Sequence, residues 1–157
     1  MELIIKRFEA LTLPELYEIL QLRVAVFVVE QNCAYQEVDG RDLSAYHVFL
    51  REGGEICAYL RVLDPGVAFE EAAIGRVVAK KRGCGLGDKI LKAGIAVARE
   101  KWRADSIKLE AQVSVRGFYE KVGFVQSSDI FLEDGIAHMQ MTLQLGEEAP
   151  GAREAGA

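Results

Sequence analysis

Residues 80–87 combine cationic side chains with closely spaced glycines. In order along the chain these residues are Lys80, Lys81, Arg82, Gly83, Gly85 and Gly87. The segment follows an apolar stretch at 77–79 and precedes a long amphipathic one, which predicts a strand, a turn and a helix. Glycine permits backbone conformations that a Cβ forbids, and the N–H groups at a helix start bind anions. The residue types and their order therefore predict a phosphate-binding loop.

The distribution of charge supports this interpretation. Residues 74–103 contain nine Lys and Arg against two acids, although the whole chain has a net charge of −5. The loop lacks the Lys-Ser/Thr pair of a Walker A motif, and Asp88 stands where a dinucleotide fingerprint needs its third glycine. The pattern that fits is R-x-x-G-x-G, at Arg82, Gly85 and Gly87. A plain strand-to-helix connection is the alternative, because basic glycine-rich turns also occur without a ligand.

A second pattern, Y-x-x-x-G-F, follows at Tyr119, Gly123 and Phe124. Aromatic residues near a helix end usually pack in the core, which is the alternative for Tyr119 taken alone. Together, in this order and at this spacing, the two patterns resemble the acetyl-coenzyme A site of the GNAT N-acetyltransferases. Residues 22–42 (LRVAVFVVEQNCAYQEVDGRD) and 132–139 (LEDGIAHM) resemble the ElaA-like branch of that superfamily.

The resemblance implies a site for acetyl-coenzyme A, and no metal is expected. The pyrophosphate would lie on the loop and the pantetheine arm beside strand 77–79, where the N–H of Val78 would stabilise the oxyanion. Tyr119 would donate a proton to the departing thiolate. The superfamily often has Asn seven residues before this Tyr, where Gln112 offers the same chemical groups. The expected coenzyme-binding residues are Val77, Val78, Ala79, Arg82, Gly83, Cys84, Gly85, Leu86, Gly87, Gln112 and Tyr119.

The acceptor is expected to be a primary amine, of a small molecule or a peptide, that attacks the thioester directly. An alkyl ammonium with a pKa near ~10.4 leaves little free amine at pH 7, so a general base is expected. The candidates are Glu110, on an alternating strand, and His138, in the last hairpin, while Glu30, Glu37 and Glu133 stay open. For each of them a solvated or structural side chain is the alternative.

The N-terminal segment is acidic. Residues 1–60 hold ten acids against five bases, including Glu30, Glu37, Asp39 and Asp42. If this segment borders the amine channel, as the resemblance implies, it would favour a cationic acceptor. Ordinary solvated acidity is the alternative.

Hydrophobic periodicity predicts the elements that position these residues. Strands are expected at 3–8, 46–50, 56–63, 77–79, 107–113, 124–131 and 137–145, and helices at 12–28, from 86 onward and after 114. Thr12 to Glu15 has the form of a capping box, and Ser114 could cap the short helix. The order predicts an α/β (mixed α+β) protein with a central mixed, mostly antiparallel sheet and helices on both faces. That is the GNAT acyl-coenzyme A N-acyltransferase fold which the resemblance implies, in one domain at 1–146 with a disordered tail at 147–157.

Composition excludes several classes of protein. The chain has 157 residues, half of them apolar and 27% charged, which fits one globular domain. The negative net charge argues against nucleic-acid binding, and no apolar run approaches the ~18–20 residues of a membrane span. Three cysteines, Cys33, Cys57 and Cys84, without C-x-x-C spacing favour a reduced, cytoplasmic setting. Superfamily members are often dimers, so a homodimer is the default expectation.

The leading hypothesis is an acetyl-coenzyme A-dependent N-acetyltransferase. The first alternative is a catalytically inactive module of the same fold that binds acyl-coenzyme A without transferring the acyl group. The second is a thiol-regulated protein that uses one of its three cysteines, none of which is paired in sequence.

Overall fold

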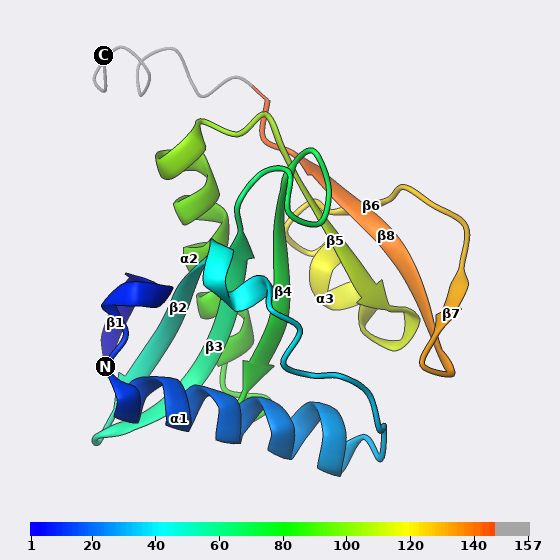
Figure 1. Ribbon diagram of the computed structural model, residues 1–157. Helices are drawn as coiled ribbons and strands as arrows, with labels where there is room; N and C mark the ends of the chain where they lie inside the picture. The colour runs from blue at the N-terminus through cyan, green and yellow to red at the C-terminus, as the bar shows by residue number, and fades with distance from the viewer. Residues whose placement is uncertain (147–157) are drawn as a thin grey trace.

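The computed structural model describes residues 1–146, and the segment 147–157, where the sequence suggests a tail, lies outside them (Figure 1). Its strands are β1 (Glu2–Arg7), β2 (Ala45–Glu52), β3 (Glu55–Leu63), β4 (Ala72–Ala79), β5 (Ser106–Gln112), β6 (Val125–Gln126), β7 (Phe131–Glu133) and β8 (Ile136–Gln144). Its helices are α1 (Leu13–Arg23), α2 (Leu86–Trp102) and α3 (Arg116–Glu120), with the π-helical segment η2 (Val24–Glu30) and the 3₁₀ segments η1 (Phe8–Ala10), η3 (Arg41–Ser44) and η4 (Val113–Val115). No helix within residues 1–146 is long and apolar enough to cross a membrane.

The described strands share one mixed sheet (Figure 1). Its order is β1-β2-β3-β4-β5-β8-β6, and β7 pairs with β8. Every pairing is antiparallel except that of β4 with β5, which is parallel. The α2 helix provides the crossover that a parallel pair requires. The prediction of a mixed, mostly antiparallel sheet is confirmed.

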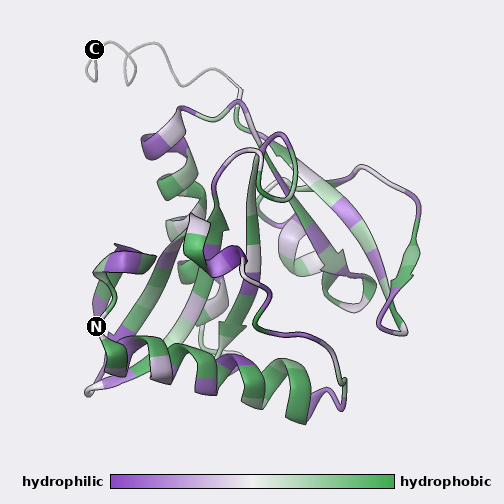
Figure 2. Ribbon diagram, in the orientation of Figure 1, coloured by the Kyte–Doolittle hydropathy of each residue, from purple (hydrophilic) through white to green (hydrophobic). Residues whose placement is uncertain are grey.

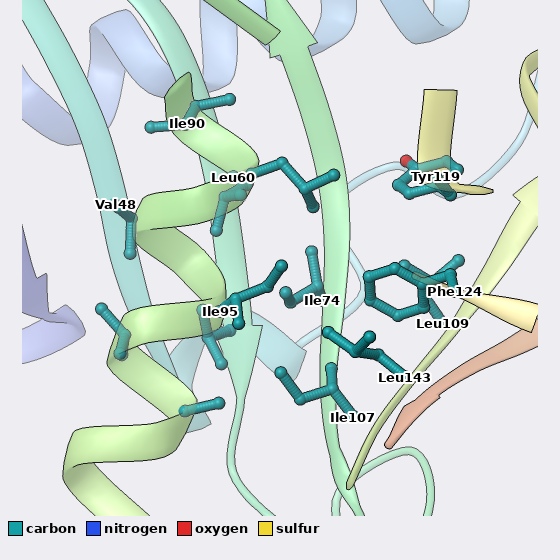
Figure 3. Packing of buried hydrophobic residues seen from close by; sticks show 14 of the residues in the cluster. Val48, Leu60, Ile74, Ile90, Ile95, Ile107, Leu109, Tyr119, Phe124 and Leu143 are labelled. Atoms are coloured by element: carbon teal, nitrogen blue, oxygen red, sulfur yellow. The ribbon is translucent and has the colours of Figure 1, made fainter. Parts of the chain in front are cut away.

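Helices cover both faces of this sheet, as predicted. Successive strand residues point to opposite faces, so Val48 and Leu60 pack with Ile90 of α2, whereas Phe49 packs with Ile19 of α1. Figure 3 shows the α2 side of this core, and Figure 2 shows hydrophobic residues, in green, along β2, β3 and β4 and on α1. Each fully buried aliphatic side chain contributes about 1.5–3 kcal/mol, so these two layers account for much of the fold's stability.

The start of α1 confirms the capping box. The Thr12 hydroxyl accepts a hydrogen bond from the Glu15 N–H (3.2 Å), and the Glu15 carboxylate accepts one from the Thr12 N–H (2.8 Å). The helical path continues through η2 to Glu30, slightly beyond the predicted end near Val28. The Gln31 N–H bonds the Val26 carbonyl five residues earlier, which is the π-helical pattern.

Two local predictions near the C-terminal half are wrong. Ser114 does not cap α3, because the chain first makes the 3₁₀ turn η4 and the helix begins two residues later, with Val115 at its N-cap. The strand expected at 124–131 is divided into β6 and β7. Between them Ser127 and Ser128 bond Gln140 of β8, and the Ser128 hydroxyl accepts the Gln140 N–H (2.8 Å) in place of a strand carbonyl.

The approach of α2 to the sheet requires a glycine at position 94. An added Cβ there would lie 2.8 Å from Cδ1 and 2.9 Å from Cδ2 of Leu60, which is completely buried on β3. Because core side chains are close-packed, Leu60 has little room to yield. Gly94 therefore sets the distance between α2 and the sheet.

We expect Gly94→Ala to destabilise the protein by about 1 kcal/mol. Overpacking against Leu60 costs about 1–3 kcal/mol, and the better helix propensity of Ala offsets about 1 kcal/mol of it. Urea unfolding measures the change, and a double-mutant cycle with Leu60→Ala should remove most of the penalty. A Gly94→Ala variant as stable as the wild type would contradict this packing argument.

Six buried or partly buried charges hold the loop 31–44 against the sheet, and we call them the arginine–carboxylate network. They are Arg23, Arg61, Arg76, Glu37, Asp39 and Asp42. Arg23, which has no exposed surface, lies 2.7 Å from both Glu37 and Asp42. Arg61 lies 2.7 Å from Asp39 and 2.9 Å from Asp42. An unpaired buried charge is very unfavourable, so three cations must meet three anions for the loop to pack here.

The network keeps its carboxylates ionised. Burial by itself would raise the pKa of Asp39, but the hydrogen bonds and charge of Arg61 outweigh it and hold that pKa below its usual range. Burial opposes ionisation of Asp42 as well, and Arg23 and Arg61 together lower its pKa. Both side chains are therefore anionic throughout the neutral range.

His47 lies fully buried beneath this loop as a neutral imidazole. The Asp42 carbonyl can only accept, so Nε2 donates to it (3.0 Å), and Nδ1 accepts from the Tyr59 hydroxyl (2.8 Å). Burial is the main cause that lowers the pKa of His47, and the charges of Arg23 and Arg61 lower it further. Protonation would place a fourth cation among the arginines.

We expect the free energy of unfolding to decrease as the pH falls below about 6.5. The unfolded chain protonates His47 there and the folded chain does not, which gives a slope of up to about 1.4 kcal/mol per pH unit. Below about pH 4 the lowered pKa values of Asp39 and Asp42 act in the same direction, because the unfolded carboxylates protonate first. Urea unfolding between pH 5 and 8 measures the part of this pH dependence that His47 causes.

His47→Gln should flatten the slope between pH 5 and 6.5. His138→Gln, at the protein's other histidine, is the control and should preserve the slope. An unchanged slope in His47→Gln would show that another group causes the pH dependence.

Candidate active site

Strands β4 and β5 form a fork. Their parallel pairing consists of Ala72 opposite Ile107 and Ala73 opposite Lys108, and no later residue of the described chain continues it. Figure 1 shows the two strands diverging from this point toward their C-terminal ends. Near the paired ends, Phe124 and Leu109 lie between the two strands in Figure 3, and both share a buried cluster with Ile74. Farther along, the facing backbone groups are not used by the sheet and can bind an extended ligand.

The alternation of β4 decides which N–H groups face the fork. The Lys80 N–H bonds the Cys57 carbonyl of β3 (2.8 Å), and the register pairs Tyr59 with Val78. Hydrogen-bonded pairs alternate in an antiparallel ladder, so the Val78 N–H points toward β3 and those of Val77 and Ala79 point away from it. The geometry therefore disfavours Val78 as oxyanion donor and favours Val77, while Val78 contributes its buried side chain to the α1 side of the core.

The glycine-rich loop begins α2 beside the C-terminal end of β4. Gly83 (φ +81°) and Gly85 (φ +78°, the N-cap of α2) have left-handed backbones, with no atom within 4 Å of an added Cβ. This open backbone at the start of a 17-residue helix fits an anionic group. Gly87 serves a different purpose, because an added Cβ would lie 3.1 Å from the Phe118 ring.

The side chains of the loop lie in different environments. Arg82 is exposed and forms an ion pair with Glu30 at the end of η2 (3.1 Å), and Lys80 forms one with Glu55 (3.3 Å). The exposed Cys84 thiol is directed to the Lys81 carbonyl (3.3 Å). The side chain of Leu86 is buried in the core, so this residue offers the loop its backbone.

Tyr119 stands beyond the cluster that fills the paired end of the fork. Its ring packs edge-on against Phe118 (centroids 4.9 Å apart) and Phe124 (5.9 Å), and Figure 3 shows its hydroxyl directed toward β4. Among the described residues the hydroxyl has no hydrogen-bond partner. Burial raises the pKa of Tyr119 well above its usual value, so the hydroxyl keeps its proton at neutral pH. The group is therefore available as a proton donor.

Glu110, Gln112 and His138 share one face of the sheet. Gln112 stands opposite His138 in the β5–β8 ladder, and Glu110 is two residues from Gln112, so all three point away from the α2 side. Gln112 donates a hydrogen bond to the Gln31 side chain (3.1 Å), whose residue follows η2. The loop after α1 therefore reaches across to the β5 side of the fork.

His138, Glu133 and Glu110 form a second group of titratable side chains. His138 Nδ1 donates to the Ile136 carbonyl (2.7 Å), so its other nitrogen faces the Glu133 carboxylate, 4.0 Å away. Partial burial raises the pKa of Glu110, and the Glu133 charge raises it further, while His138 and Arg41 act in the opposite direction. The structure thus brings the two predicted bases, Glu110 and His138, to one place.

The expectations for the acidic N-terminal segment are wrong for three of its four named acids, while Glu30 is exposed and pairs with Arg82. Glu37, Asp39 and Asp42 are neither solvated nor free to attract a cation, because the arginine–carboxylate network neutralises them. Glu37 is also excluded as a base, since its carboxylate is bound by Arg23 and by the Tyr35 hydroxyl (2.9 Å). Sequence reasoning missed this network, although Arg23 in the otherwise apolar stripe of α1 was a sign of it.

An open depression of about 480 Å³ lies between α2 and β8, away from this group of residues. Its lining includes Lys92, Arg99 and Lys121 but no residue of β4, β5 or the glycine-rich loop. We therefore place the candidate site at the fork.

A mixed sheet forked between two parallel strands, with a glycine-rich helix start at the end of one, defines the acyl-coenzyme A N-acyltransferase fold. A crystal structure of an acyl-CoA N-acyltransferase from Pseudomonas aeruginosa matches with a TM-score of 0.86 and 40% identity, over 91% of this chain and 99% of that chain. The crystal structure of Escherichia coli ElaA matches with a TM-score of 0.85 and 34% identity over the same shares.

Sequence comparison gives the family. Residues 16–145 match the model of the acetyltransferase (GNAT) domain. Protein ElaA of Escherichia coli is 36% identical over 139 residues, 86% of this chain and 91% of ElaA. A UPF0039 protein of Schizosaccharomyces pombe is 38% identical over 149 residues, 92% of this chain and 98% of that protein. The chain belongs to the GNAT acetyltransferase family and resembles its ElaA members.

Proposed function

We propose that this protein is an acetyl-coenzyme A-dependent N-acetyltransferase whose acceptor is a primary amine. The family supports an acyl-coenzyme A N-acyltransferase; the acetyl donor and the amine acceptor are our proposal. The observation that supports it most directly is the fork between β4 and β5. The glycine-rich loop follows β4 on one side of the fork, and the Glu110–His138 group lies on β5 and β8 on the other. One ligand in the fork would reach both.

Acetyl-coenzyme A supplies a thioester, which is an activated acyl group with a good leaving group. The N–H groups from Arg82 to Gly87 would hold its pyrophosphate, since Gly83 and Gly85 leave the backbone open. The backbone of Val77 and Ala79 would pair with the pantetheine arm on the side that β5 has left. The Val77 N–H, at the start of this stretch, would stabilise the negative charge that develops on the thioester oxygen.

Deprotonation of the amine is the demanding part of the reaction. At pH 7 one alkyl amine in ~2,500 is neutral, which corresponds to about 4.6 kcal/mol of barrier without assistance. Glu110 would accept this proton, directly or through water, with Glu133 and His138 tuning its pKa. Tyr119, which stays protonated, would donate to the departing thiolate.

We expect excess acetyl-coenzyme A to stabilise the native protein. At about 100-fold above Kd the gain is about 2.7 kcal/mol, or a shift of the melting temperature of roughly 5–10 °C. Gly85→Glu should abolish the shift, because it places a Cβ and an anion in the proposed phosphate site. Gly66→Glu is the matched control: Gly66 also has a left-handed backbone (φ +91°) with no atom near an added Cβ, but lies before β4. No shift in the folded wild type would refute the proposed coenzyme site.

Tyr119→Phe should slow thiol release from acetyl-coenzyme A with a panel of primary amines by about 100-fold. The loss reflects the missing proton donor, so the affinity for acetyl-coenzyme A should stay within about threefold. Wild-type binding without turnover on any amine would instead favour the alternative of an inactive coenzyme-binding module.

Glu110→Gln should remove the acidic limb of the pH–rate profile. The base acts when deprotonated, and because the pKa of Glu110 is raised, this limb should lie above the ordinary glutamate value of about 4.3. Glu100→Gln, on the exposed side of α2, is the control and should keep the wild-type profile. Retention of the limb in Glu110→Gln would assign the base to another group.

A further inference from the structure

Strand β4 contains a bulge immediately before its proposed catalytic N–H. In the β3–β4 ladder Tyr59 pairs with Val78 and Arg61 pairs with Gly75, so β4 uses one residue more than β3 over this step. Arg76 and Val77 therefore stand together opposite Leu60, which is the arrangement of a β-bulge. Bulges bend a strand and change the direction of its backbone groups.

Arg76 has an unusual backbone conformation for its residue type. Its φ is +53°, in the left-handed region that glycine adopts easily and residues with a Cβ rarely do. Gly75 is the immediate neighbour, yet the left-handed position is taken by Arg76. The side chain must therefore offset the unfavourable backbone conformation.

The Arg76 guanidinium is tied to the loop 31–44. It forms an ion pair with the Glu37 carboxylate, donates to the Glu37 carbonyl (3.0 Å) and lies 3.4 Å from the Asp39 carboxylate. Its Cζ atom lies over the Tyr35 ring, 5.5 Å from the ring centroid. Both acids are themselves fixed, Glu37 by Arg23 and Asp39 by Arg61, each at 2.7 Å. The contact is thus a rigid anchor.

The anchor acts on the peptide plane between Arg76 and Val77. The Val77 N–H belongs to this plane, so the φ and ψ angles of Arg76 determine where that N–H points. A hydrogen-bond donor must lie within about 2.7–3.1 Å of the developing oxyanion to stabilise it, so a small rotation of the plane removes its effect.

The same loop also contacts the other side of the fork. Gln31 accepts from Gln112 of β5 (3.1 Å), and the Cys33 thiol faces the Asp134 carbonyl of the β7–β8 turn (3.8 Å). The loop therefore joins β4, through Arg76, to β5 and to the turn next to His138. It fixes the two strands relative to each other as well as the bulge.

We propose that Arg76 is a positioning residue: its ion pairs with Glu37 and Asp39 hold the β4 bulge so that the Val77 N–H points at the thioester oxygen. This inference rests on the proposed function. It assigns a chemical consequence to the arginine–carboxylate network in addition to its contribution to stability.

The test uses acetyl-coenzyme A with a ¹³C-labelled thioester carbonyl and isotope-edited infrared spectroscopy. A hydrogen bond to this carbonyl lowers its stretching frequency, so the bound spectrum reports hydrogen bonding to the thioester oxygen, which we assign to the Val77 N–H. We expect a lowered frequency in the wild type and a value close to that of the free ligand in Arg76→Gln. Thiol release should fall by about 10- to 100-fold in Arg76→Gln, with the Kd for free coenzyme A within about threefold. Arg76→Lys, which keeps the charge, should restore part of the frequency shift.

Arg51→Gln is the matched control. Its side chain is 22% exposed, compared with 20% for Arg76, and forms an ion pair with Glu18 (3.4 Å) on the α1 side of the sheet. This variant should keep the wild-type frequency and turnover. If Arg76→Gln does not fold, Asp39→Asn, which weakens the same anchor, should give an intermediate frequency.

Three outcomes separate the possibilities. A wild-type frequency in folded Arg76→Gln, or in Asp39→Asn where Arg76→Gln does not fold, would overturn the positioning role. An equal change in Arg51→Gln would overturn it too, because the effect would then come from general destabilisation. A wild type that does not bind acetyl-coenzyme A would refute the proposed function itself.

Discussion

The need to neutralise buried charge determines how the N-terminal half of this protein is arranged. Arg23 is the last residue of α1 and has no exposed surface, so its charge must be met inside the fold. The loop 31–44 supplies Glu37 and Asp42 for it, and Asp39 and Asp42 meet Arg61 of β3. A loop whose only regular element is the short 3₁₀ segment η3 is thereby held in one path, because any other path would leave charges buried and unpaired.

This path places the loop beside both strands of the candidate site. Strands β4 and β5 pair at Ala72–Ala73 and Ile107–Lys108, and beyond these residues they separate. The loop crosses from Arg76 on one side to Gln112 on the other, through contacts that link segments far apart in sequence. The group around Glu110 and His138 lies on the face that this loop approaches. The opposite face holds the apolar core of α2, which fixes the strands and includes the ring of Tyr119.

The two faces of the sheet are therefore stabilised by different kinds of interaction. On the α2 side, close packing such as that of Gly94 against Leu60 holds the glycine-rich loop at the end of β4. On the α1 side, polar and charged contacts hold the bulge and the residues that would meet the acceptor. The candidate site is thus supported by an apolar layer on one face of the sheet and a charged layer on the other.

Much of this could be predicted from the sequence, because the relevant signals are local. The capping box at Thr12, the glycines of residues 83–87 and the alternation of β5 depend on neighbouring residues, and each gave the correct element. The Tyr119 pattern likewise located a buried tyrosine at the fork. The prediction that Ser114 caps a helix was wrong, because a 3₁₀ turn follows β5 and the helix begins later. The prediction of one strand at 124–131 was wrong because Ser127 and Ser128 bond Gln140 and interrupt it.

Only the tertiary structure decided how the charges pair and which N–H groups face the fork. From the sequence we predicted that the acids at 37, 39 and 42 form a solvated or substrate-attracting surface. In the structure each of them forms an ion pair with an arginine 14 to 39 residues away. Similarly, the orientation of Val77 relative to Val78 depends on the register of β4 with β3 and on the bulge at Arg76. The sequence by itself determined most of the elements and the position of the glycine-rich loop, since these follow from short-range backbone preferences. Charge neutralisation and strand register are properties of the assembled sheet, because each requires partners that meet only when the chain has folded.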